Sequence, residues 1–296
     1  MKKPLLTIYL VTYNHEAYIE KCLNSILEQV VNFEYKVIVL DDASTDGTSK
    51  IVLRYSKLYP DKIFPIIRQI NLGAVENIYQ GLVNVDTEFF AVIDGDDYWC
   101  DTGKLRKQID ALMQHPNIHM CAHNTIIRTP PSSADFLRFS FPDKKEGALL
   151  TFDCQNMPMP HPSSRVYRVT YDFKKVRNHV VIASDFCLFW YYGLQTKKLL
   201  FINSAMSVYN RHGKGIWSGA TIKQRKYRKL SKIKILNEEL GFRYWLFSFK
   251  RFYKTLPKKY RLLFHIMFML NRSASYKFFV NIYRLKLWIF DLPPKN

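Results

Sequence analysis

The sequence lacks the features that define several common classes of protein. Its five cysteines are odd in number and scattered, with no Cys-x-x-Cys pair, so neither a disulfide framework nor a zinc site is indicated. No apolar run reaches the roughly 18–20 residues that a membrane-spanning helix needs. The N-terminus lacks the apolar region and small-residue cleavage site of a signal peptide. These absences predict a protein of the reducing cytosol.

Two common nucleotide-binding motifs are also missing. The chain has no Walker A phosphate loop and no Gly-x-Gly-x-x-Gly after its first apolar segment. If the protein recognises a nucleotide, carboxylates and a metal ion must bind its phosphates in place of a glycine-rich loop.

Acidic residues are scarce in the last quarter of the chain. Residues 221–296 hold 19 Lys and Arg against 3 Asp and Glu, a net charge of +16 out of the +19 of the whole chain. Trp, Tyr and Phe are interleaved with these basic residues, a composition that suits helices lying on anionic lipid. Nucleic-acid binding and packing of the aromatic residues on the remainder of the protein are the alternatives. We expect a basic helical extension here.

Apolar segments that suit buried strands alternate with segments of helical periodicity over the first hundred residues. The predicted strands are Leu5–Thr12, Val37–Leu40, Ile63–Arg68 and the run that ends at Asp94. Asn14 is predicted to cap the helix that follows the first strand. The alternation predicts an α/β fold with a Rossmann-type, mostly parallel sheet and flanking helices. Further along, a helix is expected over Lys104–Gln114 and a strand over Ile118–Ala122.

Polar residues stand where three of these strands end. They are Thr12-Tyr13-Asn14, Asp41-Asp42 and Asp94-Gly95-Asp96-Asp97. Ligands of such sheets bind beyond the carboxyl ends of the strands, so these groups are expected to share one crevice. Three carboxylates within four residues repel one another unless a cation lies among them, and Mg²⁺ or Mn²⁺ with a substrate phosphate is the natural partner. An Asp-Gly turn in which Asp97 caps the next segment is the alternative.

Four segments resemble those of family-2 glycosyltransferases with the GT-A fold. They are Val11-Thr12-Tyr13-Asn14, Val39 to Thr48, Asn71-Leu72-Gly73 with Asn77, and Ile93 to Trp99. His161-Pro162-Ser163-Ser164, Ser184-Asp185 and Val208 to His212 resemble the acceptor half of that family more loosely. The resemblance implies a GT-A-like domain whose residues 1–100 bind the nucleotide sugar and whose residues 101–220 form the acceptor-binding and catalytic half. Residues 221–296 form the basic tail.

The resemblance also implies roles for individual residues in donor binding. Thr12 and Tyr13 would line the base pocket, and Asp42 would bind the uracil or ribose side. Asp96 would ligate the metal directly, and Asp94 would hold the ribose or a metal-bound water. The other residues expected in the donor site are Asn14, Asn71, Gly73, Asn77 and Gly95.

An inverting sugar transfer also needs a base that takes the proton of the acceptor hydroxyl. Asp185 is the sole carboxylate in the apolar stretch Val180–Leu194, a setting that suits proton uptake, and the resemblance favours the same residue. The alternative is a structural role at the start of a helix that runs through Trp190.

The segment from Arg211 to Gly219 is basic and rich in glycine. His212 is a candidate metal ligand, and Arg211 and Lys214 are candidates for pairing with phosphate. The glycines would let the segment close as a lid, while a solvated basic loop is the alternative. On the acceptor side we place Trp99, His161, Ser163 and Trp217.

Together these features predict a metal-dependent inverting glycosyltransferase. It would move a sugar from a nucleotide-diphosphate donor, with a UDP-sugar favoured, to a glycan or lipid-linked acceptor in surface polysaccharide synthesis. The Gln-x-x-Arg-Trp signature of processive members is absent, which favours the addition of one sugar at a time. We expect a cytoplasmic protein, peripheral on the inner face of the membrane. A nucleotidyltransferase and a basic nucleic-acid-binding protein are the alternatives.

Overall fold

The computed structural model describes residues 3–129, 135–139, 141, 143–154, 159–170, 173 and 184–212. Lys214, Trp217 and the predicted tail 221–296 lie outside these residues, so the expectations for them stay predictions. Within the described residues, none of the helices has both the length and the apolar character needed to cross a membrane.

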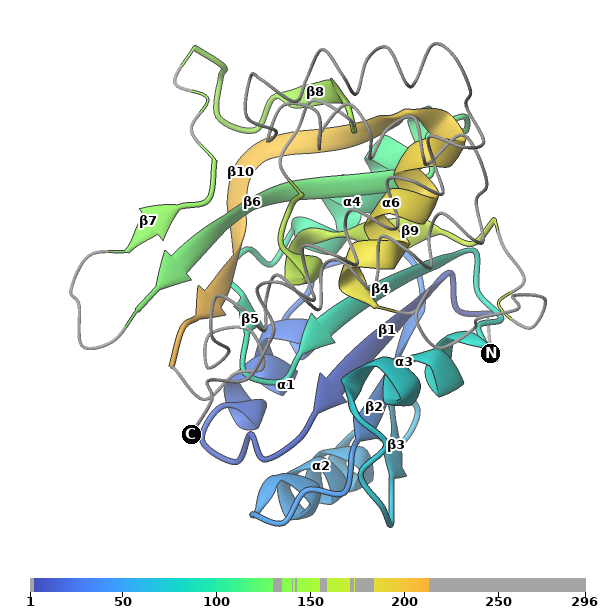
Figure 1. Cartoon of the computed structure of the whole chain (residues 1–296), viewed down its shortest axis with the longest axis vertical. Coiled ribbons are helices and arrows are strands. Elements are labelled where there is room, and N and C mark those ends of the chain that lie inside the picture. The colour runs from blue at the N-terminus through green and yellow to red at the C-terminus, as the bar shows by residue number, and fades with distance from the viewer. Residues whose placement is uncertain are drawn as a thin grey trace, which may run out of the picture. The chain divides into compact units, whose positions relative to one another are not determined.

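Four parallel strands and the helices between them form the first half of the fold (Figure 1). In chain order the elements are β1 (Leu6–Thr12), α1 (Ile19–Leu27), β2 (Tyr35–Asp41), α2 (Thr48–Leu58), β3 (Ile63–Ile67), α3 (Ala74–Leu82) and β4 (Phe89–Asp94). The strands lie in the order β3-β2-β1-β4. The predicted alternation of strands and helices is confirmed for this half.

β1 is the central strand of this half, and all seven of its residues are buried. Its apolar and β-branched residues suit a strand that is covered on both faces. Thr12 pairs with Asp41 of β2, and Val11 pairs with Asp94 of β4. This parallel register brings the polar ends of three strands to the same edge of the sheet.

The second half of the fold mixes parallel and antiparallel pairs. Its elements are β5 (Tyr98–Trp99), α4 (Lys104–Gln114), β6 (Met120–Arg128), β7 (Phe136–Leu137), β8 (Leu149–Asp153), the 3-10 helix η1 (Pro162–Ser164), β9 (Val166–Arg168), α6 (Asp185–Thr196) and β10 (Lys198–Asn210). The sheet continues from β4 through β9, β6 and β10 to β5, and the long β6–β10 pair is parallel. In Figure 1 the arrowheads of β1, β4, β6 and β10 point to the same side of the molecule. The predicted helix over Lys104–Gln114 is confirmed, whereas the strand expected at Ile118 starts two residues later and is longer.

Helices cover both faces of the sheet because successive side chains of a strand point to opposite faces. Ile8 and Phe89 belong to the core that also contains apolar residues of α1, α2 and α4. Their neighbours in the strands, Tyr9 and Phe90, face the other side. There Tyr9 approaches Gly81 of α3, and Phe90 contacts Tyr192 of α6.

Asn14 does not cap α1, contrary to the prediction. The helix begins only at Ile19, with Tyr18 as its N-cap residue. Asn14 instead has a φ of 55°, a left-handed conformation that asparagine tolerates. Its Oδ1 accepts a hydrogen bond of 2.8 Å from the backbone N–H of Thr45. The residue thereby joins the loop after β1 to the loop after β2.

Gly81 sets how closely α3 approaches the sheet, which generates a first prediction. A Cβ atom at this position would lie 2.9 Å from Leu40 Cδ1 and 3.0 Å from the ring of Tyr9. Gly81→Val should therefore lower the free energy of unfolding by about 1–3 kcal/mol, because the added side chain overpacks the interface. Urea denaturation measures the change. Lys50→Val puts the same side chain at an exposed position of α2 and should cost only about 0.5 kcal/mol; an equal loss in both variants would refute the packing argument.

Candidate active site

Hydrogen bonds to side chains tie together the loops that follow β1 and β2. The backbone N–H of Asn14 donates to Ser44 Oγ at 2.9 Å, and that of His15 donates to Thr48 Oγ1 at 2.8 Å. Together these two loops form one wall of the site. The Thr12 side chain is buried within it and bonds to His15 Nδ1 at 3.3 Å. Tyr13 remains 43% exposed beside it. The contact of Thr12 and Tyr13 with a base stays a prediction.

Asp42 is held by the loop that follows β3. The backbone N–H groups of Leu72 and Gly73 each donate to its carboxylate at 2.8 Å, and Asn71 Nδ2 donates to its carbonyl at 3.0 Å. Gly73 has a φ of 83°, a conformation that favours glycine. Asp42, Asn71 and Gly73 thus form one unit, and a nucleotide contact of Asp42 would use the lone pairs that remain on its carboxylate.

Asn77 supports this unit from inside the protein. Its side chain is fully buried, donates to Leu40 O at 3.0 Å and accepts from Arg68 Nε at 3.2 Å. The predicted direct contact of Asn77 with the donor is therefore wrong for this arrangement, because both ends of the amide are engaged and sealed. Asn77 orients Arg68 at the end of β3 instead.

Gly95 lets the turn after β4 lie against the loop after β1. A Cβ atom there would lie 2.9 Å from both Ile19 Cδ1 and Thr12 Oγ1, and 3.0 Å from His15 Nδ1. The backbone N–H of Gly95 donates to Val11 O at 2.8 Å. Gly95 thus contributes through close packing, which holds the turn and the carboxylates on either side of it against the loop after β1.

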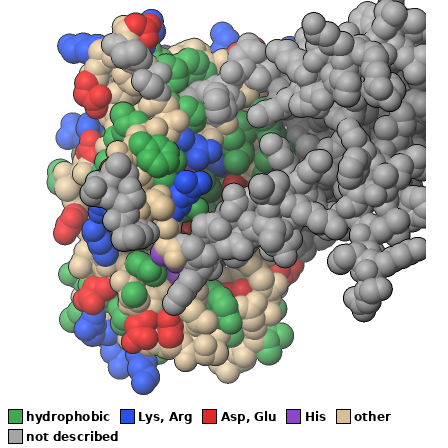
Figure 2. Space-filling view, turned by 60° about the vertical axis from the view of Figure 1, so that its left-hand side comes forward, with side chains coloured by type: hydrophobic (Ala, Val, Ile, Leu, Met, Phe, Trp, Pro, Cys, Tyr) green, Lys and Arg blue, Asp and Glu red, His purple; other side chains and the backbone are tan. Residues whose placement is uncertain are grey.

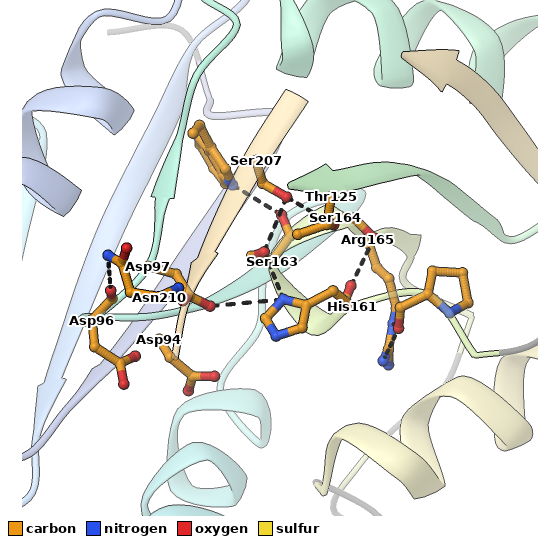
Figure 3. A network of polar contacts seen from close by, with 12 residues as sticks. Asp94, Asp96, Asp97, Thr125, His161, Ser163, Ser164, Arg165, Ser207 and Asn210 are labelled. Atoms are coloured by element: carbon orange, nitrogen blue, oxygen red, sulfur yellow. Dashed lines mark hydrogen bonds and ion pairs between the residues drawn. The ribbon is translucent and has the colours of Figure 1, made fainter. Parts of the chain in front are cut away.

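Asp94, Asp96 and Asp97 bring their carboxylates together at the end of β4 (Figure 3). One oxygen from each lies within 4.8 Å of the other two. Burial, together with the charges of Asp96 and Asp185, raises the pKa of Asp94 to about 8, and Arg165 partly opposes this rise. Burial and the two neighbouring carboxylates also raise the pKa of Asp97 well above its usual range. The cluster therefore retains protons at neutral pH unless a cation balances its charge.

Asp96 faces two imidazole rings. Its Oδ2 lies 2.9 Å from His212 Nε2 and 3.7 Å from His15 Nε2. The ring of Tyr18 stacks on His212 with a centroid distance of 4.8 Å. The other ring nitrogen of His212, Nδ1, is buried and has no hydrogen-bond partner among the described residues. The three carboxylates are oxygen ligands of the kind that Mn²⁺ and Mg²⁺ prefer, so the residues present fit the predicted metal.

Asp97 joins the two halves of the sheet. Its Oδ1 accepts a hydrogen bond of 3.1 Å from the backbone N–H of Asn210, at the end of β10. Asn210 Nδ2 in turn donates to the backbone carbonyl of Asp96 at 2.8 Å. On the opposite side, Asp97 Oδ2 lies 3.7 Å from His161 Nδ1. Burial and the charges of Arg138 and Arg165 lower the pKa of His161 well below its usual range, so this imidazole is neutral.

Asp185 is the first residue of α6, and Ser184 caps the helix by accepting a hydrogen bond of 3.4 Å from Cys187 N. Its carboxylate is close enough to raise the pKa of Asp94. The buried Arg165 fixes this end of the helix by donating to the Asp185 carbonyl at 2.7 Å. The helical start expected as the alternative is confirmed, and the role of Asp185 as the base stays a prediction.

Three arginines lie within electrostatic reach of one another beside these carboxylates: Arg138, Arg165 and Arg211. Arg138 donates to Met159 O at 3.2 and 2.9 Å, and Arg211 is exposed. Burial and the charges of the other two arginines lower the pKa of Arg138, whereas Tyr209 and Asp185 oppose the change. Figure 2 brings this end of the sheet forward and shows Lys and Arg side chains gathered near a His side chain. This end of the sheet thus combines acidic and basic side chains.

Trp99 does not lie where an acceptor sugar would reach it. The side chain is 3% exposed, its Nε1 donates to Ser163 O at 2.9 Å, and the buried Lys104 lies over its ring at 4.1 Å. The predicted acceptor contact of Trp99 is therefore wrong for this arrangement, because the indole belongs to the core. Ser163 is fully buried as well, and His161 is the most exposed of the three described acceptor-side candidates, at 8%.

Several residues of the site escaped the sequence analysis. They are His15, Tyr18, Arg138, Arg165, Tyr209 and Asn210. The segment from Val208 to His212 already contained two of them, so its resemblance to the family was a usable signal. Arg138 and Arg165 carry no such signal, because single arginines in a basic chain do not stand out.

Bacterial proteins are similar in sequence to parts of this chain. The uncharacterized protein Rv1520 of Mycobacterium tuberculosis is 32% identical over 228 residues, which are 75% of this chain and 63% of the relative. The chain therefore spans less than two thirds of that relative. The dTDP-rhamnosyl transferase RfbG of Shigella flexneri is 34% identical over 128 residues, 42% of this chain and 43% of RfbG.

Solved structures share the fold. TarS of S. aureus, residues 1–349 in complex with UDP, has a TM-score of 0.53 at 18% identity, covering 86% of this chain and 76% of the solved chain. The mannosyltransferase PcManGT of Pyrobaculum calidifontis, in complex with GDP-Man and Mn²⁺, has a TM-score of 0.55 at 16% identity, covering 79% of this chain and 64% of PcManGT. These likenesses establish the GT-A fold. The sequence model described as Glycosyl transferase family 2 matches residues 7–173, more than half of the chain, and the chain belongs to that family.

Proposed function

We propose that this chain is a metal-dependent inverting glycosyltransferase that moves a sugar from a nucleotide-diphosphate donor to a hydroxyl group of a glycan or lipid-linked acceptor. The observation that carries the proposal is the convergence of the β4 carboxylates with His212, beyond β10, and with Asp185, on α6. The β4 carboxylates and His212 suit a metal-bound diphosphate, and Asp185 suits the acceptor hydroxyl, whose proton it would take.

The comparisons support a nucleotide-sugar donor. TarS was solved with UDP and with UDP-GlcNAc, and PcManGT with GDP-Man and Mn²⁺. RfbG is named a dTDP-rhamnosyl transferase. We favour a UDP-sugar for this chain, and we place its reaction in surface polysaccharide synthesis.

Asp96 and His212, with Asp94 or Asp97, would hold Mn²⁺ or Mg²⁺. When bound, the metal neutralises the charge that builds up on the leaving diphosphate. Arg211 adjoins His212 and is exposed, so its guanidinium is placed to pair with a phosphate oxygen. Tyr13 and Asp42 would contact the nucleoside from the other wall of the crevice.

Asp185 would accept the proton of the attacking hydroxyl. Its position does not depend on the donor, because the Ser184 cap and the Arg165 hydrogen bond hold the start of α6. A direct attack on the sugar from the side opposite the diphosphate inverts the anomeric carbon in a single step. The enzyme then needs one base and no nucleophile of its own.

A donor screen tests the proposed reaction. Nucleotide sugars are incubated with the protein and Mn²⁺ or Mg²⁺, and the released product is identified. Release of the nucleoside diphosphate is expected, and it should stop when the metal is chelated. Release of pyrophosphate would instead identify a nucleotidyltransferase and overturn the proposal.

The metal site generates a second prediction. Asp96→Asn should lower turnover by on the order of 10³-fold, because a neutral amide neither ligates the metal well nor balances its charge. Steady-state kinetics and UDP binding with and without Mn²⁺ measure the effect. Asp110→Asn makes the same chemical change at an exposed position of α4 and should leave turnover unchanged. Near-normal turnover of Asp96→Asn would contradict the metal site.

The base generates a third prediction. Asp185→Asn should lower sugar transfer by about 10²–10⁴-fold while donor affinity stays nearly normal, because the base acts on the acceptor. Transfer rate and donor Kd are measured in parallel. Ser184→Ala is the control: it weakens the helix cap, at a cost of about 1 kcal/mol, and keeps the carboxylate. If Ser184→Ala lost as much transfer as Asp185→Asn, the helix position and not the base would be responsible.

We further propose that residues 221–296 hold the enzyme on the inner face of the membrane, and this generates a fourth prediction. The support is the net charge of +16 in that segment, interleaved with aromatic residues. Each Lys or Arg near an anionic leaflet contributes about 1 kcal/mol. The full chain should sediment with vesicles that contain phosphatidylserine and not with purely zwitterionic ones, and high salt should weaken the binding only in part. A stronger preference for RNA at equal ionic strength would contradict the membrane role.

A further inference from the structure

A chain of buried hydroxyl groups runs from His161 into the interior (Figure 3). His161 Nδ1 lies 2.8 Å from Ser163 Oγ. Ser163 Oγ donates to Ser207 Oγ at 3.2 Å, and Ser207 Oγ lies 3.0 Å from Thr125 Oγ1. Ser163, Ser207 and Thr125 are all fully buried. The chain crosses from η1 to β10 and β6.

Counting hydrogens along this chain determines the tautomer of His161. A serine hydroxyl has a single hydrogen, and Ser163 gives it to Ser207. Ser163 Oγ can then only accept from His161, so Nδ1 of His161 carries the ring hydrogen. Asp97 Oδ2 lies 3.7 Å from the same nitrogen, which is beyond hydrogen-bond distance, so it does not compete with Ser163 for the ring hydrogen.

The other nitrogen of the ring, Nε2, is then a bare hydrogen-bond acceptor. Among the described residues, Nε2 has no hydrogen-bond partner. It does not belong to the fully buried side-chain atoms without a partner, so solvent reaches it. Figure 3 shows this ring edge facing away from Asp97 and Ser163. The ring itself is held in place by Tyr209, which stacks on it with a centroid distance of 4.5 Å.

Arg165 connects the turn that carries His161 to the start of α6. Arg165 donates from Nε to Pro160 O at 3.0 Å, and from Nη1 to the Asp185 carbonyl at 2.7 Å. The same guanidinium thus ties the residue before His161 to the start of α6. On the side of β4, Asp97 Oδ2 lies 3.7 Å from the imidazole of His161.

We propose that Thr125, Ser207 and Ser163 fix neutral His161 as its Nδ1–H tautomer, and that Nε2 accepts a hydrogen bond from a hydroxyl group of a sugar substrate. This specificity role rests on the proposed function. An analogue that lacks the hydroxyl, or carries a methyl ether in its place, leaves Nε2 without a donor and is selected against. The hydroxyl belongs to the donor sugar or to the acceptor, and kinetics separate the two.

The tautomer is tested on the free protein, independently of any activity. The full chain is labelled with ¹⁵N-histidine, and the His161 signals are assigned by their loss in His161→Asn. The two ring nitrogens should show the pattern of a neutral ring protonated at Nδ1. A ring protonated at Nε2, or at both nitrogens, would overturn the proposal whether or not the protein transfers sugars.

Ser207→Ala tests the hydroxyl chain. Removing this acceptor frees the Ser163 hydrogen to point at Nδ1, so the fraction of the Nε2–H tautomer should rise. Thr7→Val breaks a different buried hydroxyl pair, Thr7 with Thr87 at 2.8 Å, and should leave the His161 spectrum unchanged. An unchanged spectrum in Ser207→Ala would overturn the role of the chain.

Two amide variants test the substrate contact. Asparagine places an N–H donor near the position of Nδ1 and offers nothing at Nε2, whereas glutamine places an amide oxygen near Nε2. His161→Asn should raise the KM of one sugar substrate about 10-fold, the equivalent of one hydrogen bond, and His161→Gln should restore much of the loss. A raised donor KM assigns the hydroxyl to the donor sugar, and a raised acceptor KM assigns it to the acceptor. Equal KM values in wild type and His161→Asn would overturn the contact.

Discussion

The repulsion among three carboxylates at the end of one buried strand is the constraint on which the site depends. Asp94, Asp96 and Asp97 are pressed together by the turn after β4, and burial makes their charges costly. A different group stabilises the charge of each carboxylate. Arg165 acts on Asp94, two imidazoles face Asp96, and the backbone of Asn210 bonds to Asp97. A divalent cation would complete the balance.

The groups that stabilise these charges come from both halves of the sheet, and so the site exists only when the halves are joined. β4 supplies the carboxylates, whereas Asn210 and His212 come from the far end of β10, more than a hundred residues later. Arg165 connects the same cluster to α6 and thereby to Asp185. The donor-side loops, tied by Asn14 and Asp42, form a wall that needs only the first half. In the proposed function, the wall faces the nucleoside and the acidic cluster faces the diphosphate.

Local pattern predicted the first half of the fold well because its signals are local. Each strand there is a run of buried apolar residues, and each helix repeats its apolar residues within one segment. β8 and β9 were not predicted, because short antiparallel strands take their identity from the partner they join. The long strand β10 was not predicted either. Asn14 shows the same limit on a smaller scale. It looks like a helix cap, but the loop after β2 offers its side chain a backbone N–H instead.

The sequence by itself determined that this chain has strand-end carboxylates, a lone aspartate in an apolar segment and a strongly basic end, and these are matters of order and composition. Only the tertiary structure decided which polar residues share the crevice. Trp99 and Asn77 are buried because the core offers them space and hydrogen-bond acceptors. Arg138 and Arg165 lie at the site although their segments carry no motif. The reason is physical. Burial and the approach of distant charges are properties of the packed chain, and no single segment carries them.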